Sequence, residues 1–160
     1  MSTPDTRPAP HGTATDDGLV ARRPRVIVAD IDGTCAHRGD RSPYDESRDG
    51  EDTPDDAVRF LLRAAASTGE CRVVYLSGRT QRSRRATSAW LALHGFPTGD
   101  LWMRRDGDRR PDTVVKRELY RRHLAGEDVI AVVDDRPSVC RMWRSLGLTV
   151  LQVGDPHVEF

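Results

Sequence analysis

The chain alternates between short β-branched runs and segments with helical periodicity, and this alternation restricts its possible folds more than any other feature. The predicted strands are 25–29, 71–76, 101–103, 129–133 and 149–153. The predicted helices lie between them, at 54–68, 81–94, 111–124 and 137–146. Because each helix can carry the chain back across the sheet, we expect a mostly parallel sheet of about five strands with helices on both faces. This is a doubly wound, three-layer α/β sandwich of the Rossmann-like kind.

Local signals predict where these elements begin and end. Thr53 is expected to cap the first helix, Pro54 to occupy its first position and Gly69 to end it. Leu61 is expected in the apolar stripe of this helix, and Leu93 in the packed face of the next one. These assignments predict which helical faces meet the sheet.

Composition separates an N-terminal arm from one folded domain. Residues 1–23 are rich in Pro, Thr, Asp and Gly and lack apolar periodicity, which predicts a disordered arm before a single domain at 24–160. The chain has no apolar run of the ~18 residues needed to span a bilayer, and its start lacks a signal-peptide pattern. Its three cysteines form no Cys-x-x-Cys pair. We therefore expect a cytoplasmic protein without a membrane segment, a disulfide framework or a zinc site.

In doubly wound sheets, ligands bind beyond the carboxyl ends of the strands, so the residues that follow each strand are the candidates for chemistry. The first predicted strand is followed by Asp30-Ile31-Asp32-Gly33-Thr34. Its two carboxylates repel each other unless a cation lies between them. A divalent cation held by oxygen ligands relieves this repulsion and can also bridge a phosphate. An Asp-rich turn is the alternative, since Asp-Gly is a common turn pair, but the whole pentapeptide after an apolar strand favours catalysis.

Two further motifs bring groups suited to phosphate. Ser77-Gly78-Arg79 is expected at a strand-to-helix turn, where a hydroxyl, backbone N–H groups and an arginine fork suit an anion. Lys116 is the only lysine among 25 basic residues, and Asp112 precedes it by one turn on the same helical face. Taken alone, the first motif is also an ordinary turn and the second a surface ion pair.

Asp134 and Asp135 follow the fourth predicted strand, so polar groups stand at the ends of successive strands or in the helix that follows. We expect these groups to meet around one cation and one phosphate. In this arrangement the chain resembles the haloacid dehalogenase (HAD) superfamily of phosphotransferases. The matching pieces are Asp30-x-Asp32-Gly33-Thr34, Ser77, Lys116 and Asp134-Asp135.

The HAD resemblance implies a Mg²⁺-dependent phosphatase with a defined division of roles. Asp30 would attack phosphorus and become an aspartyl-phosphate, while Asp32 would protonate the leaving oxygen and later activate water. Lys116 would hold the phosphoryl oxygens. Further substrate contacts are expected from Thr34, Ser77 and Gly78. The expected Mg²⁺ ligands are Asp30, the Asp32 carbonyl and the pair Asp134 and Asp135, either of which could be the direct ligand.

A closer resemblance is to the phosphatase domain of polynucleotide kinase–phosphatase enzymes, particularly the phage form, and it spans nearly all of residues 25–160. Its most specific pieces are Arg41-x-Pro43-Tyr44-Asp45 and Gly107-Asp108-x-Arg110-x-Asp112-x-Val114-Val115-Lys116-x-Glu118, and it also includes Asp134-Asp135-Arg136. This resemblance implies that the substrate is a phosphorylated DNA or RNA end, with the phosphate at the 3′ position. It also implies that Arg41 and Arg79 contact phosphate and that Asp112 orients Lys116.

Enzymes of that kind also carry a kinase domain, whose phosphate loop needs Gly-Lys followed by Ser or Thr. The sole lysine follows Val115, so that loop is absent and a separate kinase or ligase partner is expected. The gaps from Thr34 to Ser77 and from Ser77 to Lys116 are filled by predicted helices and strands, which leaves no room for a cap domain. A site without a cap admits the end of a polymer, whereas a small metabolite would gain little burial there.

Two arginine clusters are expected near the same rim, where they could bind the flanking phosphates of a nucleic-acid strand. They comprise Arg79, Arg82, Arg84 and Arg85, and Arg104, Arg105, Arg109 and Arg110. A solvated helix face is the alternative. Two other functions stay open: a phosphatase of nucleotides or other small phosphomonoesters, and a module that binds phosphorylated ends without hydrolysing them. The presence of both Asp30 and Asp32 speaks against the second.

Overall fold

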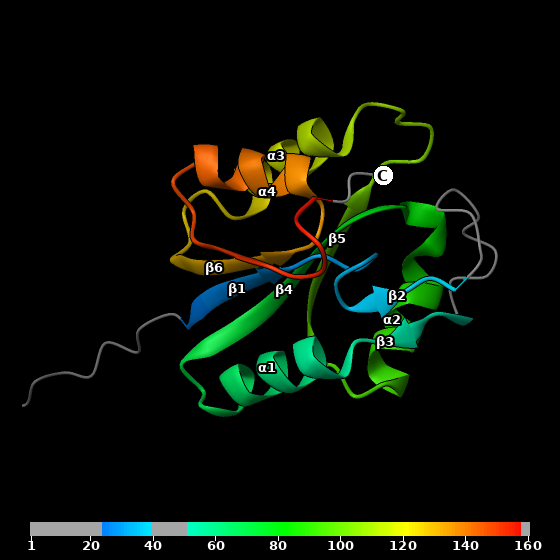
Figure 1. Ribbon diagram of the computed structural model, residues 1–160, viewed down its shortest axis with the longest axis vertical. Helices are drawn as coiled ribbons and strands as arrows, with labels where there is room; N and C mark the ends of the chain where they lie inside the picture. Colours follow the sequence, from blue (N-terminus) through cyan, green and yellow to red (C-terminus); the bar gives the residue numbers. More distant parts are fainter. Residues whose placement is uncertain (1–23, 40–50, 158–160) are drawn as a thin grey trace, which may run out of the picture.

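A sheet of five parallel strands lies at the centre of the protein. The computed structural model describes residues 24–39 and 51–157. The strands of this sheet are β1 (Arg25–Ala29), β4 (Cys71–Thr80), β5 (Gly99–Arg104), β6 (Val129–Asp134) and β7 (Val150–Gln152). They lie in the order β5-β4-β1-β6-β7 (Figure 1). The disordered arm predicted for residues 1–23 and the role predicted for Arg41 fall outside the described residues.

The helices cover the sheet on both faces, as the alternation of elements predicts. They are α1 (Asp56–Ser67), α2 (Arg84–Leu93), α3 (Asp112–His123) and α4 (Pro137–Ser145). One core cluster joins β1 to α1 and α2 through Ile27, Val58, Leu62, Trp90 and Leu91. The other joins β1 to α3 and α4 through Val28, Val115, Leu119, Met142 and Trp143. In Figure 1, α3 and α4 lie above the sheet and α1 below it. The predicted three-layer α/β sandwich is confirmed.

The start of α1 differs from the prediction. Asp55, not Thr53, caps the helix, because Oδ1 of Asp55 accepts the Val58 N–H at 2.8 Å. Thr53 and Pro54 instead form the short strand β3 (Thr53–Pro54), which pairs with β2 (Ala36–His37). The prediction was wrong because β2 is too short to show a periodic pattern in the sequence.

Two leucines expected in the core lie at the surface. Leu61 is 45% exposed and Leu93 is 79% exposed. On α1 the packed face is set by Val58 and Leu62 with the half-buried Ala65, and position 61 falls at the margin of that stripe. The stripe that meets the sheet is therefore narrower than the apolar pattern indicates.

Strand β4 is longer than predicted. Ser77, Gly78 and Arg79 lie inside it, and its pairing with β5 is irregular between Ser77 and Thr80. A 3₁₀ turn over Gln81–Ser83 follows before α2 begins at Arg84. The prediction of a strand-to-helix turn at Ser77 was therefore wrong, since the helix begins several residues later.

The described residues hold no inserted domain between the motifs. From Thr34 to Ser77 they contain β2, β3, α1 and most of β4, and from Ser77 to Lys116 they contain α2, β5 and the start of α3. None of the helices in the described part of the chain is long and apolar enough to cross a membrane.

Candidate active site

The candidate site lies at the carboxyl ends of β1 and β6, which are adjacent and parallel. Ala29 is aligned with Val133, and the Asp30 N–H donates to the Val133 carbonyl at 2.9 Å. Asp30 therefore leaves β1 beside Asp134 and Asp135. These three buried aspartates each place one carboxylate oxygen within 4.8 Å of the others. The fold thus brings together three of the residues predicted to bind a metal ion.

Lys116 lies between two of these carboxylates. Its Nζ is 2.8 Å from Asp30 Oδ1 and 2.9 Å from Asp134 Oδ2, and only 2% of the side chain is exposed. Burial alone would lower the pKa of Lys116, but the charges of Asp134 and Asp30 outweigh it and raise that pKa above its ordinary value. The ammonium group therefore stays charged at neutral pH. A compact ammonium suits this position better than a planar guanidinium would.

The two aspartates at the end of β6 are held by different donors. Asp134 Oδ2 accepts the Trp143 Nε1–H at 3.1 Å as well as the Lys116 ammonium, and Oδ1 accepts the Arg136 N–H at 3.3 Å. Asp135 Oδ1 accepts the hydroxyl of the fully buried Thr34 at 3.1 Å. Thr34, which was predicted to contact substrate, orients Asp135 in this structure.

Asp32 is held by Arg79 rather than by the aspartate cluster. Arg79 donates from Nε to Asp32 Oδ2 at 2.9 Å and from Nη2 to Asp32 Oδ1 at 2.8 Å, a bidentate pair. Nη2 also donates to Asp52 Oδ2 at 2.6 Å, and Nη1 donates to Thr87 Oγ1 at 3.2 Å. Arg79 is only 4% exposed, and its buried guanidinium group holds Asp32 in place. Its predicted contact with phosphate stays a prediction, as does the role of the Asp32 carbonyl.

Asp112 binds two arginines. Arg104 Nη2 donates to Asp112 Oδ1, and Arg136 Nη1 donates to Asp112 Oδ2 at 3.1 Å. Asp112 acts on Lys116 through its charge, which helps to raise the lysine pKa, while the hydrogen bonds of Lys116 go to Asp30 and Asp134. The predicted role of Asp112 in orienting Lys116 is thus, at most, an indirect one in this structure.

Ser77 and Gly78 line the same region from inside β4. The Ser77 hydroxyl accepts the Arg79 N–H at 3.1 Å. The Gly78 carbonyl accepts Arg104 Nε at 2.8 Å, and a Cβ atom on Gly78 would lie 2.5 Å from Asp112 Oδ1. Only glycine fits against the carboxylate here. The substrate contacts predicted for Ser77 and Gly78 stay predictions.

The charge of the cluster fits a hard divalent cation. Asp30, Asp134 and Asp135 face the single ammonium of Lys116, so negative charge is in excess. Burial raises the pKa of Asp30 well above its ordinary value. The pKa of Asp135 is also raised, by burial and by the negative charge of Asp134. An added cation would restore the ionised carboxyls. Oxygen ligands of this kind are those preferred by Mg²⁺.

The two arginine clusters are only partly open to solvent. Arg79 and Arg104 point into the site, as described above. Arg110 is paired with Asp108 and Glu118, at 2.6 and 2.8 Å. The exposed members of the clusters are Arg82, Arg85, Arg105, Arg109 and Arg110. The predicted basic surface is therefore smaller than the sequence indicates.

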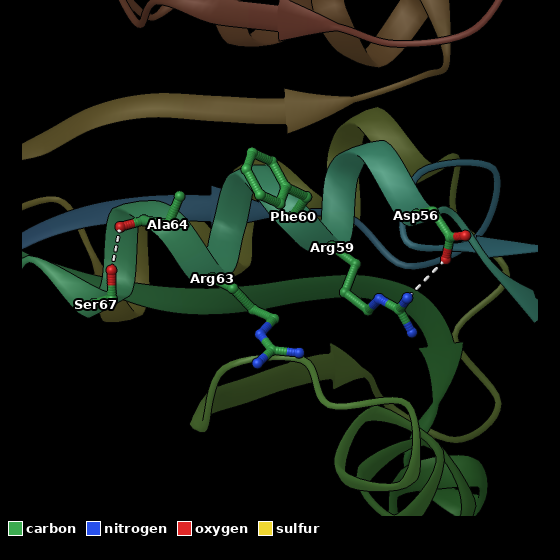
Figure 2. Close-up of a pocket in the computed structure, with 6 residues that line it drawn as sticks. All are labelled: Asp56, Arg59, Phe60, Arg63, Ala64 and Ser67. Carbon is green, nitrogen blue, oxygen red and sulfur yellow. Dashed lines mark hydrogen bonds and ion pairs between the residues drawn. The ribbon is translucent and has the colours of Figure 1, made fainter.

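A surface cleft lies along α1. It is lined by Asp56, Arg59, Phe60, Arg63, Ala64 and Ser67 (Figure 2). Arg59 forms an ion pair with Asp56 at 2.9 Å across one helical turn. The cleft shares no residue with the aspartate–lysine cluster, so it is not the candidate phosphate site.

The chain matches a family model described as the polynucleotide kinase PNKP phosphatase domain over residues 24–157. A protein of Autographa californica nuclear polyhedrosis virus, named as a bifunctional polynucleotide kinase/RNA ligase, is 33% identical over 141 residues. That match covers 86% of this chain and 20% of the viral protein.

Solved structures agree with this match. A chain in the structure of the Pnkp1/Rnl/Hen1 RNA repair complex superposes with a TM-score of 0.80 at 32% identity, covering 84% of this chain and 44% of that one. A second structure of the Pnkp1/Rnl/Hen1 complex gives a TM-score of 0.78 at 32% identity, with 84% and 47% covered. This chain thus spans a fifth of the viral relative and less than half of each structural relative. It belongs to the family of polynucleotide kinase PNKP phosphatase domains and is a phosphatase of the hydrolase class.

Proposed function

We propose that this protein is a Mg²⁺-dependent polynucleotide 3′-phosphatase that works through an aspartyl-phosphate on Asp30. The observation that carries the proposal is the buried Asp30 carboxylate, held by Lys116 next to Asp134 and Asp135. Phosphoryl transfer places negative charge on oxygens that need fixed positive groups nearby. Asp30, Asp134, Asp135 and the Asp32 carbonyl would hold Mg²⁺, which when bound would neutralise charge on the phosphoryl oxygens.

The reaction needs two displacements at phosphorus. In the first, an Asp30 carboxylate oxygen bonds to phosphorus, the bond to the leaving oxygen breaks, and Asp32 gives that oxygen a proton. In the second, Asp32 takes a proton from water and the water oxygen attacks phosphorus. The bond to Asp30 then breaks, which releases phosphate and restores the Asp30 carboxylate.

Two cations of the chain support these steps, Lys116 at Asp30 and Arg79 at Asp32. Lys116, 2.8 Å from Asp30, would stabilise the charge that moves onto the phosphoryl oxygens. Arg79 holds both oxygens of Asp32, which fixes the orientation of the Asp32 carboxyl group for proton transfer. Asp32 is itself partly exposed, so it can meet both the leaving group and water.

The polynucleotide substrate is supported by the family to which the chain belongs. The viral relative is named for kinase and RNA ligase activities, and the structural relatives come from an RNA repair complex. We therefore propose that the substrate is the 3′-phosphorylated end of DNA or RNA. The described residues place no inserted domain over the site, which leaves space for a polymer end.

A kinase or ligase partner is proposed on the same basis, because the relatives are longer chains named for those activities or assembled with Rnl and Hen1. We also propose a reducing, cytoplasmic location. Its support is that Cys35, Cys71 and Cys140 are all free thiols.

The test compares phosphate release, with and without Mg²⁺, from three substrates: a 3′-phosphorylated oligonucleotide, its 5′-phosphorylated counterpart and a 3′-mononucleotide. We expect the 3′-phosphorylated oligonucleotide to be hydrolysed fastest, and only with Mg²⁺. Asp30→Asn should release no phosphate and serves as the control. Equal or faster turnover of the mononucleotide would reject the polynucleotide substrate, and no release from any ester would support a binding module instead.

A further inference from the structure

Trp143 is fully buried in α4, yet its indole N–H points at the candidate site. Its Nε1 donates to Asp134 Oδ2 at 3.1 Å, and the residue has 0% of its surface exposed. Buried tryptophan rings usually find a hydrogen-bond partner for this group. Here the partner is a carboxylate in the aspartate cluster rather than a neutral carbonyl.

The Trp143 hydrogen bond can orient Asp134 because of the oxygen on which it falls. Asp134 Oδ2 also accepts the Lys116 ammonium at 2.9 Å, so two donors from two different helices converge on one oxygen. The other oxygen, Oδ1, accepts the Arg136 N–H at 3.3 Å. Together these three donors fix the plane of the carboxylate.

The Trp143 ring is itself held in place from α3. Tyr120 packs against it edge-on, with ring centroids 5.8 Å apart and an angle of 73° between the planes. Tyr120 lies one turn after Lys116 on the same helix, so α3 supplies both the ammonium and the ring contact. A shift of Trp143 would therefore disturb Asp134 and Lys116 together.

Trp90 offers a comparison within the same protein. It is also buried, but its Nε1 donates to the main-chain carbonyl of Asp52 at 2.9 Å, and the backbone already fixes the direction of that carbonyl. A side-chain carboxylate can rotate, so a donor directed at it constrains it. Groups that orient metal-binding carboxylates and histidines typically matter about 10–100-fold for activity.

We propose that Trp143 is a positioning residue: its N–H keeps Asp134 turned toward Lys116, and so keeps Lys116 against Asp30. This inference rests on the proposed phosphatase function of the same site. It does not require that Trp143 touch substrate or metal.

The first test observes the hydrogen bond directly by heteronuclear NMR on isotope-labelled protein. The chain has three tryptophans, so three indole N–H signals are expected, and each is assigned by Trp→Phe substitution. We expect the Trp143 signal to lie downfield and to move in Asp134→Asn, while that of Trp102 stays in place. A Trp143 signal that is unaffected by Asp134→Asn would overturn the proposal, whether or not the protein is active.

The second test measures activity with Trp143→Phe, which removes the N–H but keeps a ring against Tyr120. Its matched control is Trp102→Phe, because Trp102 packs at the edge of the same core cluster and stacks on His123 instead. We expect Trp143→Phe to lower kcat for the 3′-phosphorylated oligonucleotide about 10–100-fold, with KM little changed. Similar values of kcat for the two variants would contradict the proposal.

The two ideas fail in different ways. Wild-type protein that releases no phosphate would reject the proposed function but leave the NMR result intact. If Trp143→Phe does not fold, the first test decides alone: the Trp143 signal is then assigned by elimination from Trp90→Phe and Trp102→Phe, and its response to Asp134→Asn supports or rejects the proposal.

Discussion

Gly33 lies directly against the carboxylate of Asp135: a Cβ atom on Gly33 would be 1.9 Å from Asp135 Oδ2. The backbone of Gly33 also has a φ of +83°, in the left-handed region that side chains disfavour. The turn after β1 and the end of β6 therefore fit together only with glycine at this position. This contact explains physically why glycine follows Asp32 in the first motif.

Gly33→Ala, compared with a control glycine, separates the stability lost to the left-handed backbone from the effect of the clash with Asp135. We expect about 1–2 kcal/mol of lost stability from the left-handed backbone, plus a loss of activity of about 10²-fold because Asp135 must move. Gly147→Ala is the matched control, since its φ is +80° and no heavy atom lies within 4 Å of its Cβ position. The control should lose similar stability and keep its activity. Equal activities in the two variants would show that Asp135 need not be held in place.

Lys116→Arg tests the need for a compact ammonium. The site leaves 2% of the side chain exposed and holds Nζ between two carboxylates, so the larger planar group cannot keep both contacts. We expect kcat to fall at least about 10²-fold, the usual effect of losing one charge-stabilising donor. Arg121→Lys, an exposed position on the same helix, is the control and should behave as wild type. A Lys116→Arg enzyme with near-normal kcat would remove this lysine from the mechanism.

Asp52→Asn tests whether Asp52 positions Asp32 through Arg79. The Asp52 carboxylate is 2.6 Å from Arg79 Nη2 and 1% exposed, so its loss leaves the buried guanidinium less compensated and free to shift. We expect kcat to fall about 10- to 100-fold for an oligonucleotide, because misplaced catalytic groups lose rate steeply. The loss should be smaller for p-nitrophenyl phosphate, whose leaving group needs no proton. Asp56→Asn is the control, since that side chain is 81% exposed. A uniform loss on both substrates would mean that Asp52 serves stability alone.

The meeting of Asp30, Asp134 and Lys116 was predictable because parallel strands end at one edge and each acidic motif directly follows a β-branched run. The partners of the arginines were not predictable. Asp52 lies in a segment without periodicity, so nothing in the sequence marks it as the anchor of Arg79. Trp143 lies in the core, and a sequence does not show where a buried ring directs its N–H.

The predicted helix and strand boundaries were wrong where strand pairing competed with local sequence signals. Thr53 and Pro54 are a good helix start by composition, but pairing with β2 places them in a strand and leaves Asp55 as the cap. Ser77-Gly78-Arg79 reads as a turn, but pairing with β5 extends the strand through it. In both cases tertiary contacts outweighed local preference.

Asp55→Ala tests the observed cap. Burial alone would raise the pKa of Asp55, but the Val58 N–H and His37 lower it below its ordinary value. A lowered pKa in the folded state means that this carboxylate stabilises the fold above about pH 4 and loses that effect as the pH falls further. Urea unfolding should show a loss of about 1 kcal/mol at pH 7. The difference from wild type should shrink in acid, and a difference that grows there would contradict the cap.

The covalent step is tested most directly by finding the phosphoryl group on the enzyme. Asp32→Asn should be unable to activate water, so it should accumulate the intermediate when given Mg²⁺ and a substrate with a good leaving group. Acid-quenched protein is then digested and analysed by mass spectrometry. We expect one phosphoryl group, on Asp30, and none in a variant that also carries Asp30→Asn. The account would be contradicted if the wild-type enzyme released phosphate but the Asp32→Asn protein carried no phosphoryl group on Asp30, or carried it on another residue.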